Sequence, residues 1–107
     1  MYQTTPDTIS DETISQFKQR GFIKIPSVIS KEEAAHFHDA ALEASARVDQ
    51  GRDRPVFSQH VNVWREDETM RALTLHKNVG GIAQRLAGVP MRLWHDHILI
   101  KQPNNQV

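Results

Sequence analysis

The chain has 107 residues, enough for one small domain, and it contains no cysteine, which excludes disulfides and thiolate metal sites. Its 13 basic and 13 acidic residues give a formal net charge of zero, so it lacks the basic field that nucleic acids require. No apolar run reaches membrane-spanning length, and residues 1–7 lack the basic and apolar segments of a secretory signal. We therefore expect a cytoplasmic protein that binds neither nucleic acid nor membrane.

The first quarter of the chain predicts one helix and one short strand. Residues 1–9 are mostly polar, and we expect them to be disordered. Ser10 is a favourable N-cap and Gly21 is a natural helix end, so a helix is predicted between them. The apolar residues of 22–26, closed by a proline, predict a short strand.

Further helices are predicted from capping residues and apolar spacing. Ser30 and Glu33 have the spacing of a capping box, which opens a helix that runs to about residue 50. After a charged break at 51–55, two shorter helices are predicted at about 69–75 and 79–86. Gly88 ends the second of these.

Two extended segments carry the polar residues of interest. Residues 56–64 predict an extended segment that displays Gln59, His60 and Asn62. Residues 91–102 predict a strand, in which alternate residues share a face. His97 and Lys101 therefore lie on one face, and they can donate to an anion such as a carboxylate.

The terminal strand also allows a metal site or a purely structural role. His95 and His97 have the i, i+2 spacing with which a strand can chelate an ion. Asp96 lies on the opposite face, however, and the sequence contains no His-x-Asp or His-x-Glu spacing. We therefore predict no metal ligand in this chain, and we assign no functional role to His95 or Asp96.

Four segments resemble, in order, the phytanoyl-CoA dioxygenase family of Fe(II)- and 2-oxoglutarate-dependent oxygenases. Residues 17–25 (FKQRGFIKI) resemble its opening helix, turn and strand, and residues 57–65 (FSQHVNVWR) resemble its Gln-x-x-Asn-apolar-Trp segment. Residues 82–88 (IAQRLAG) are similar to the helix that ends in Leu-x-Gly. Residues 93–103 (LWHDHILIKQP) resemble the family strand with His-Asp-x-x-apolar-x-Lys-x-Pro.

The resemblance implies an α+β fold, with N-terminal helices and the first strands of a double-stranded β-helix (a cupin-like jelly roll). Residues 10–107 would be the N-terminal portion of one oxygenase domain. In this family the iron ligands begin with a His-x-Asp pair on the next strand, so we expect the rest of the domain to lie beyond Val107. The jelly roll would then be incomplete in this chain.

The resemblance also implies the reaction and the site. The family couples decarboxylation of 2-oxoglutarate to oxidation of an organic substrate, and the expected outcome here is hydroxylation of a small molecule. The co-substrate contacts would fall at His97 and Lys101, with His60, Gln59 and Asn62 as further candidates. Because the metal ligands are missing, we expect the 107-residue chain to be inactive alone and to bind neither Fe(II) nor 2-oxoglutarate stably. The alternative is a non-catalytic helical interaction module that uses the same scaffold.

Overall fold

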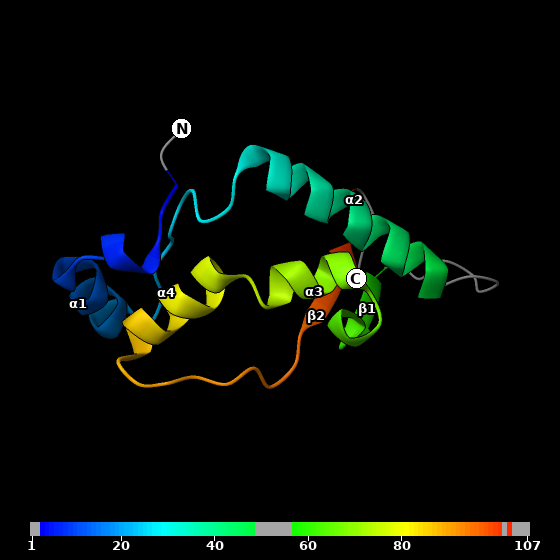
Figure 1. The fold of residues 1–107 in the computed structure, drawn as a ribbon. Coiled ribbons are helices and arrows are strands. Elements are labelled where there is room, and N and C mark those ends of the chain that lie inside the picture. The colour runs from blue at the N-terminus through cyan, green and yellow to red at the C-terminus, as the bar shows by residue number, and fades with distance from the viewer. Residues whose placement is uncertain (1–2, 49–56, 102, 104–107) are drawn as a thin grey trace. The chain divides into compact units, whose positions relative to one another are not determined.

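The computed structural model describes residues 3–48, 57–101 and 103, and Figure 1 shows the order of their helices and strands. The chain divides into two units. Unit 1 contains Met1–Ala34 and Leu75–Arg92, and unit 2 contains Ala35–Thr74 and Leu93–Val107. The assignment of residues 10–107 to a single oxygenase domain stays a prediction.

Unit 1 begins with the 3-10 helix η1 (Pro6–Thr8) and the helix α1 (Asp11–Arg20). The predicted caps of α1 are confirmed, because the Ser10 side chain accepts from the Thr13 backbone N–H and Gly21 has a φ of 81°. That left-handed conformation suits glycine, which has no Cβ to clash.

The expected disorder of residues 1–9 does not hold for residues 3–9. Ile9 is only 4% exposed, and its carbonyl accepts a hydrogen bond from Arg85 at 3.2 Å. Arg85 belongs to α4 (Lys77–Ala87), which also contacts η1. The buried Ile9 and Ile82 side chains supply apolar area for this packing. The packing could not be predicted from the composition of residues 1–9, because that composition is mostly polar.

The predicted strand at residues 22–26 is wrong. That segment has no strand conformation, and the backbone at its C-terminal end is bonded to Thr4 instead. Thr4 donates its backbone N–H to the Ser27 carbonyl at 2.7 Å and its hydroxyl to the Pro26 carbonyl at 2.8 Å. An apolar run forms a strand only where another strand pairs with it.

The helix α2 (Lys31–Val48) begins in unit 1 and continues in unit 2. Its predicted capping box is confirmed, since the Glu33 backbone N–H donates to Ser30 Oγ and the Ser30 N–H donates to Glu33 Oε1, both at 3.0 Å. The two residues after Val48 lie outside the described residues, so the predicted end near residue 50 stays a prediction.

Unit 2 holds a two-stranded antiparallel sheet, made by β1 (Phe57–Val61) and β2 (His97–Lys101). The strands lie side by side in Figure 1. Between them in the sequence come the 3-10 helix η2 (Val63–Arg65), the helix α3 (Glu68–Thr74) and α4. The predicted helices at 69–75 and 79–86 are thus confirmed as α3 and α4, and α4 ends at Gly88 in the left-handed conformation.

The core of unit 2 is small and mostly apolar. Phe37, Ala44, Val63 and Met70 are buried there.

Asp67 precedes α3 and accepts from the Met70 backbone N–H at 2.9 Å, which holds the pKa of its carboxyl below the usual value. An ion pair with Arg47 at 2.9 Å lowers that pKa further and ties α3 to α2.

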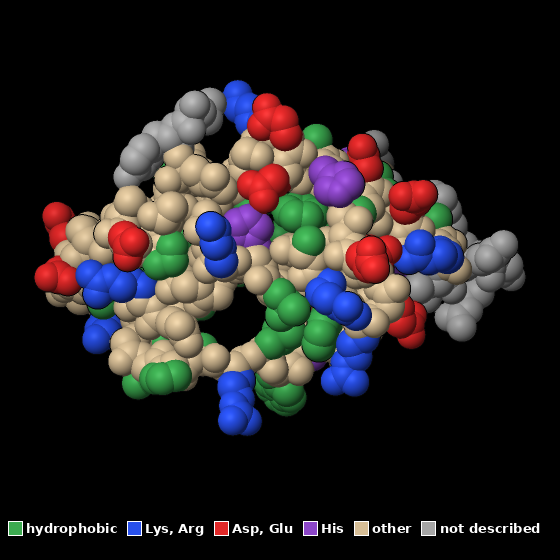
Figure 2. All heavy atoms as spheres, viewed as in Figure 1, with side chains coloured by type: hydrophobic (Ala, Val, Ile, Leu, Met, Phe, Trp, Pro, Cys, Tyr) green, Lys and Arg blue, Asp and Glu red, His purple; other side chains and the backbone are tan. Residues whose placement is uncertain are grey.

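Charges on the surface agree with the balanced composition. Figure 2 shows acidic and basic side chains interspersed on the face in view. Among the described helices, none combines the length and apolar character needed to span a membrane.

Candidate functional site

Strand β2 presents alternate side chains to solvent. His97, Leu99 and Lys101 are exposed, whereas Ile98 and Ile100 are half-buried. The prediction that His97 and Lys101 share a face is therefore confirmed. The predicted start of this strand is wrong, because residues 91–96 have no strand conformation and β2 begins only at His97.

Strand β1 adds a further donor to the same face. In the antiparallel register Gln59 lies opposite Leu99, and Val61 lies opposite His97. Residues directly opposite each other share a face of the sheet. Gln59, Val61, His97, Leu99 and Lys101 together form what we call the exposed sheet face.

The exposed sheet face has the chemistry of a carboxylate-binding wall. Lys101 offers an ammonium group, His97 an imidazole and Gln59 an amide, and all three can donate hydrogen bonds to an anion. Val61 and Leu99, at 50% and 54% exposure, place apolar area beside these donors. Polar donors set among apolar side chains are typical of small-molecule sites.

His60 lies on the other face of the sheet. It pairs with Ile98, is only 8% exposed, and its Nε2 lies 3.0 Å from the Ser45 hydroxyl of α2. The sequence prediction grouped His60 with His97 and Lys101, and the structure separates them. Adjacent residues of a strand point to opposite faces, so β1 also separates His60 from Gln59, and the packing of α2 covers His60.

Asn62 comes after the end of β1, and its side chain is turned toward its own neighbours. Its φ of 59° places it in the left-handed region, which asparagine tolerates better than most residues. The side-chain Oδ1 accepts from Trp64 Nε1 at 3.3 Å, and the backbone N–H donates to the Asp96 carbonyl at 3.0 Å. Asn62 therefore shapes the turn after β1 and is not part of the exposed sheet face.

Three aromatic rings and one carboxylate lie at the start of β2, at residues 94–97. The His95 ring lies 4.7 Å from both the Trp94 and the His97 rings, measured between centroids, and Trp94 is 87% exposed. Asp96 Oδ2 accepts from the Thr74 hydroxyl at 3.1 Å, whereas Oδ1 is buried with no partner among the described residues. Sequence reasoning missed this contact, because no local pattern connects Thr74 at the end of α3 to a residue 22 positions later.

The described residues do not fit an iron centre by themselves. Among them, no group of three or more His, Cys, Asp or Glu side chains is arranged to hold a metal ion. Non-haem iron needs such a set, commonly two histidines and one carboxylate on one side of the ion. No catalytic step through iron can therefore be assigned to these residues.

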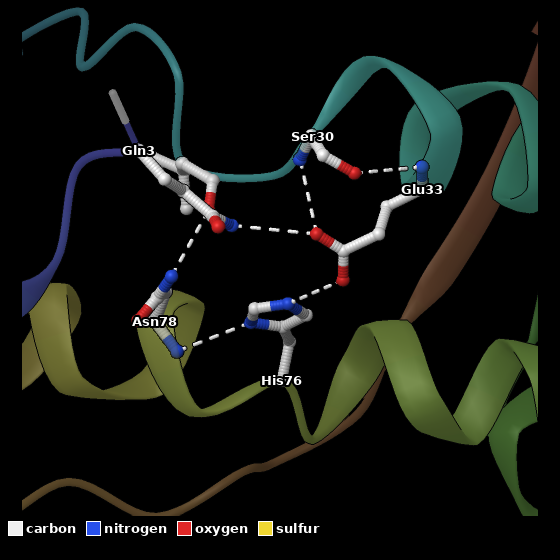
Figure 3. A network of polar contacts seen from close by, with 6 residues as sticks. Gln3, Ser30, Glu33, His76 and Asn78 are labelled. Carbon is white, nitrogen blue, oxygen red and sulfur yellow. Dashed lines mark hydrogen bonds and ion pairs between the residues drawn. The ribbon is translucent and has the colours of Figure 1, made fainter. Parts of the chain in front are cut away.

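Unit 1 contains a second polar cluster, which Figure 3 shows from close by. His76 caps α4, because its Nδ1 accepts from the Asn78 backbone N–H at 3.1 Å. Its Nε2 then carries the proton and donates to Glu33 Oε2 at 2.9 Å. Gln3 donates to the other oxygen of Glu33, at 3.3 Å, and to the Val28 carbonyl at 2.8 Å.

This cluster is satisfied by its own members. The Ser30 backbone N–H is the main cause that lowers the pKa of the Glu33 carboxyl, and the hydrogen bond from His76 lowers it further. Asn78 also donates its side-chain amide to the Val28 carbonyl at 3.2 Å. The cluster therefore joins the N-terminus, the loop before α2 and the first turns of α2 and α4, and its role is structural.

Comparison with known proteins gives an informative likeness among solved structures. No protein-family model matches the sequence, and no curated protein matches it. Among solved structures, the chain is similar to the non-heme alpha-ketoglutarate-dependent carbocyclase SnoK from nogalamycin biosynthesis. The two are 30% identical with a TM-score of 0.84, over 98% of this chain and 43% of SnoK. This chain thus spans less than half the length of that protein.

The likeness supports a relationship to the non-haem iron, 2-oxoglutarate-dependent oxygenase superfamily. The mixed fold of helices with a small antiparallel sheet agrees with part of such an enzyme. The narrower assignment to the phytanoyl-CoA dioxygenase family stays a prediction, and so does the double-stranded β-helix of which this chain would hold the first strands.

Proposed function

We propose that these residues form the N-terminal part of a non-haem Fe(II)- and 2-oxoglutarate-dependent oxygenase of the phytanoyl-CoA dioxygenase type. The exposed sheet face would be the wall that holds 2-oxoglutarate. The observation that carries this proposal is the register of β1 and β2, which gathers Gln59, His97 and Lys101 on one face of a chain similar to SnoK.

Each residue of the wall has a distinct task in this proposal. Lys101 donates a charge-assisted hydrogen bond to a carboxylate of 2-oxoglutarate, and such bonds are stronger than those between neutral groups. His97 and Gln59 orient the bound dicarboxylate through further donors. Val61 and Leu99 keep water from the carbon chain between the two carboxylates.

Iron, 2-oxoglutarate and O2 together would supply the oxidation of an unactivated C–H bond: one oxygen atom would enter the substrate as a hydroxyl group, the other would enter succinate, and carbon dioxide would be released. We propose that the iron ligands lie in a part of the enzyme that these 107 residues do not include. The rest of the same domain is then the main partner of this chain, and a small organic molecule is its substrate. Hydroxylation is the outcome we propose, in a cytoplasmic enzyme.

The test is release of succinate from 2-oxoglutarate. The protein, in the length that its gene encodes, is supplied with Fe(II), ascorbate and 2-oxoglutarate, and succinate is measured by mass spectrometry. We expect succinate that disappears when Fe(II) is chelated, since substrate-free turnover of 2-oxoglutarate needs the metal. Absence of iron-dependent succinate and of 2-oxoglutarate binding would contradict the proposed function.

The isolated 107-residue chain is the matched control. Without a metal-ligand set it should release no succinate under the same conditions. Iron-dependent turnover by this chain alone would show that the metal ligands lie within it, and would refute our placement of them.

A further inference from the structure

We propose that Asp96 is a positioning residue that locks the register of β2, and thereby keeps His97 and Lys101 on the exposed sheet face. This inference rests on the proposed function for its effect on 2-oxoglutarate. Its effect on the sheet stands on the geometry of unit 2 alone.

The register of β2 needs a constraint besides the sheet itself, because the sheet is short. Each strand has five residues, and a two-stranded sheet of this size is marginal by itself. A slip by one residue would turn every side chain of β2 to the other face. Ile98 and Ile100 would then be exposed, while His97 and Lys101 would face the core.

The backbone of Asp96 continues the pairing beyond the strand. Its carbonyl accepts from the Asn62 N–H at 3.0 Å, directly next to the pair formed by Val61 and His97. Because Asn62 adopts a left-handed conformation, the chain turns away at this point and the ladder ends. The bond between Asp96 and Asn62 therefore closes the end of the sheet that holds His97.

The side chain of Asp96 adds an anchor outside the sheet. Oδ2 accepts from the hydroxyl of Thr74, the last residue of α3, at 3.1 Å. A slipped strand would carry this carboxylate about 3.3 Å along the chain direction, which exceeds the tolerance of a hydrogen bond. Only the observed register satisfies both bonds of Asp96.

The second carboxylate oxygen of Asp96 makes no hydrogen bond to a described residue that would help to hold the register. Oδ1 is buried and has no partner among the described residues. A buried acceptor without a partner costs free energy of folding. The hydrogen bond that Oδ2 accepts must offset this cost. Asparagine has the same shape and keeps one acceptor, so Asp96→Asn separates the effect of position from that of charge.

Thr74→Val and Asp96→Ala each remove the side-chain anchor, while Thr74→Ser keeps the hydroxyl and should restore the wild-type result. The first readout is NMR amide exchange at Asn62 in the protein as its gene encodes it. We expect exchange about threefold to tenfold faster in Thr74→Val and Asp96→Ala, as for the loss of one net hydrogen bond. Asp96→Asn should stay close to wild type.

The second readout is the KM for 2-oxoglutarate in the succinate assay. Loss of register should raise this KM by about threefold to tenfold with little change in kcat, whereas simple unfolding lowers the active fraction and leaves KM unchanged. Unchanged amide exchange in both Thr74→Val and Asp96→Ala would refute the claim that the Asp96 side chain holds the register of β2. Faster exchange with an unchanged KM would refute the claim that this register affects binding of 2-oxoglutarate.

The two proposals fail in different ways. A wild-type protein that releases no succinate and binds no 2-oxoglutarate refutes the proposed function, and amide exchange then decides the register lock by itself. If Asp96→Ala does not fold, the comparison of Thr74→Val with Thr74→Ser still decides it, because these two variants differ at the hydroxyl that Asp96 accepts from.

Discussion

Two adjacent glycines of α4 offer a sharp test of the packing in unit 1. A Cβ added at Gly81 would overlap Pro6 Cγ and lie 3.3 Å from Pro6 Cβ. A Cβ added at Gly80 would meet no atom within 4 Å. Replacing each glycine with alanine therefore makes the same chemical change in two different surroundings, one residue apart.

The expected effects follow from two opposing terms. In a helix interior alanine is more stable than glycine by about 0.8–1.0 kcal/mol, which should appear in full for Gly80→Ala. Overpacking against the rigid Pro6 ring costs about 1–3 kcal/mol, and it offsets this gain in Gly81→Ala. Because the helix term cancels between the variants, Gly81→Ala should be less stable than Gly80→Ala by about 1–3 kcal/mol.

Urea unfolding at neutral pH measures this difference, provided that both variants keep the same slope against denaturant. Pro6→Ala removes the Cγ that the new methyl group would strike, so the double variant Pro6→Ala with Gly81→Ala should recover part of the loss. Equal stability of Gly80→Ala and Gly81→Ala would show that η1 does not pack on α4 as described.

Two further predictions concern polar contacts. The Glu33 carboxyl has a folded-state pKa below its ordinary value of 4.5, so its contribution to stability is present above about pH 4.5 and is lost as pH falls below it. Thermal unfolding from pH 7 to pH 3 should therefore show a weaker pH dependence in Glu33→Gln than in the control Glu32→Gln, and equal dependence would refute this role. Ser45→Ala removes the hydroxyl that is hydrogen-bonded to the buried His60 Nε2, and it should lower the free energy of unfolding in urea by about 1–3 kcal/mol. The control Ser15→Ala, at an exposed position of α1, should stay within about 0.5 kcal/mol of wild type, and a similar value for Ser45→Ala would argue against the buried contact.

Helix ends could be predicted because their signals are local. Ser10 and Gly21 bound α1, and Ser30 with Glu33 opens α2, each through contacts within a few residues of the chain. Gly88 ends α4 for the same reason as Gly21, since both adopt the left-handed conformation.

Strand boundaries could not be predicted to the same degree, because a strand depends on a partner far away in the sequence. Residues 22–26 and 91–95 carry strand-like patterns, yet neither segment has strand conformation, and neither pairs with β1 or β2. β2 begins at His97 because its partner β1 ends at Val61, the residue opposite.

The candidate site was predicted in part. Alternation alone placed His97 and Lys101 on one face, and the register with β1 brings Gln59 to them. His60 had the same polar character in the sequence, but the contact with Ser45 of α2 buries it on the other face. Asp96 had no assigned role, because its contacts with Asn62 and Thr74 exist only in the folded chain.

The most direct test of the central claim is the 2-oxoglutarate requirement of Lys101→Ala in the protein as its gene encodes it. Loss of a charge-assisted hydrogen bond worth about 1.5–3 kcal/mol should raise the KM for 2-oxoglutarate by about one to two powers of ten. Lys77→Ala, which removes an exposed lysine from α4, is the matched control and should leave this KM unchanged. An unchanged KM in Lys101→Ala, or an equal rise in both variants, would contradict the assignment of the exposed sheet face to 2-oxoglutarate.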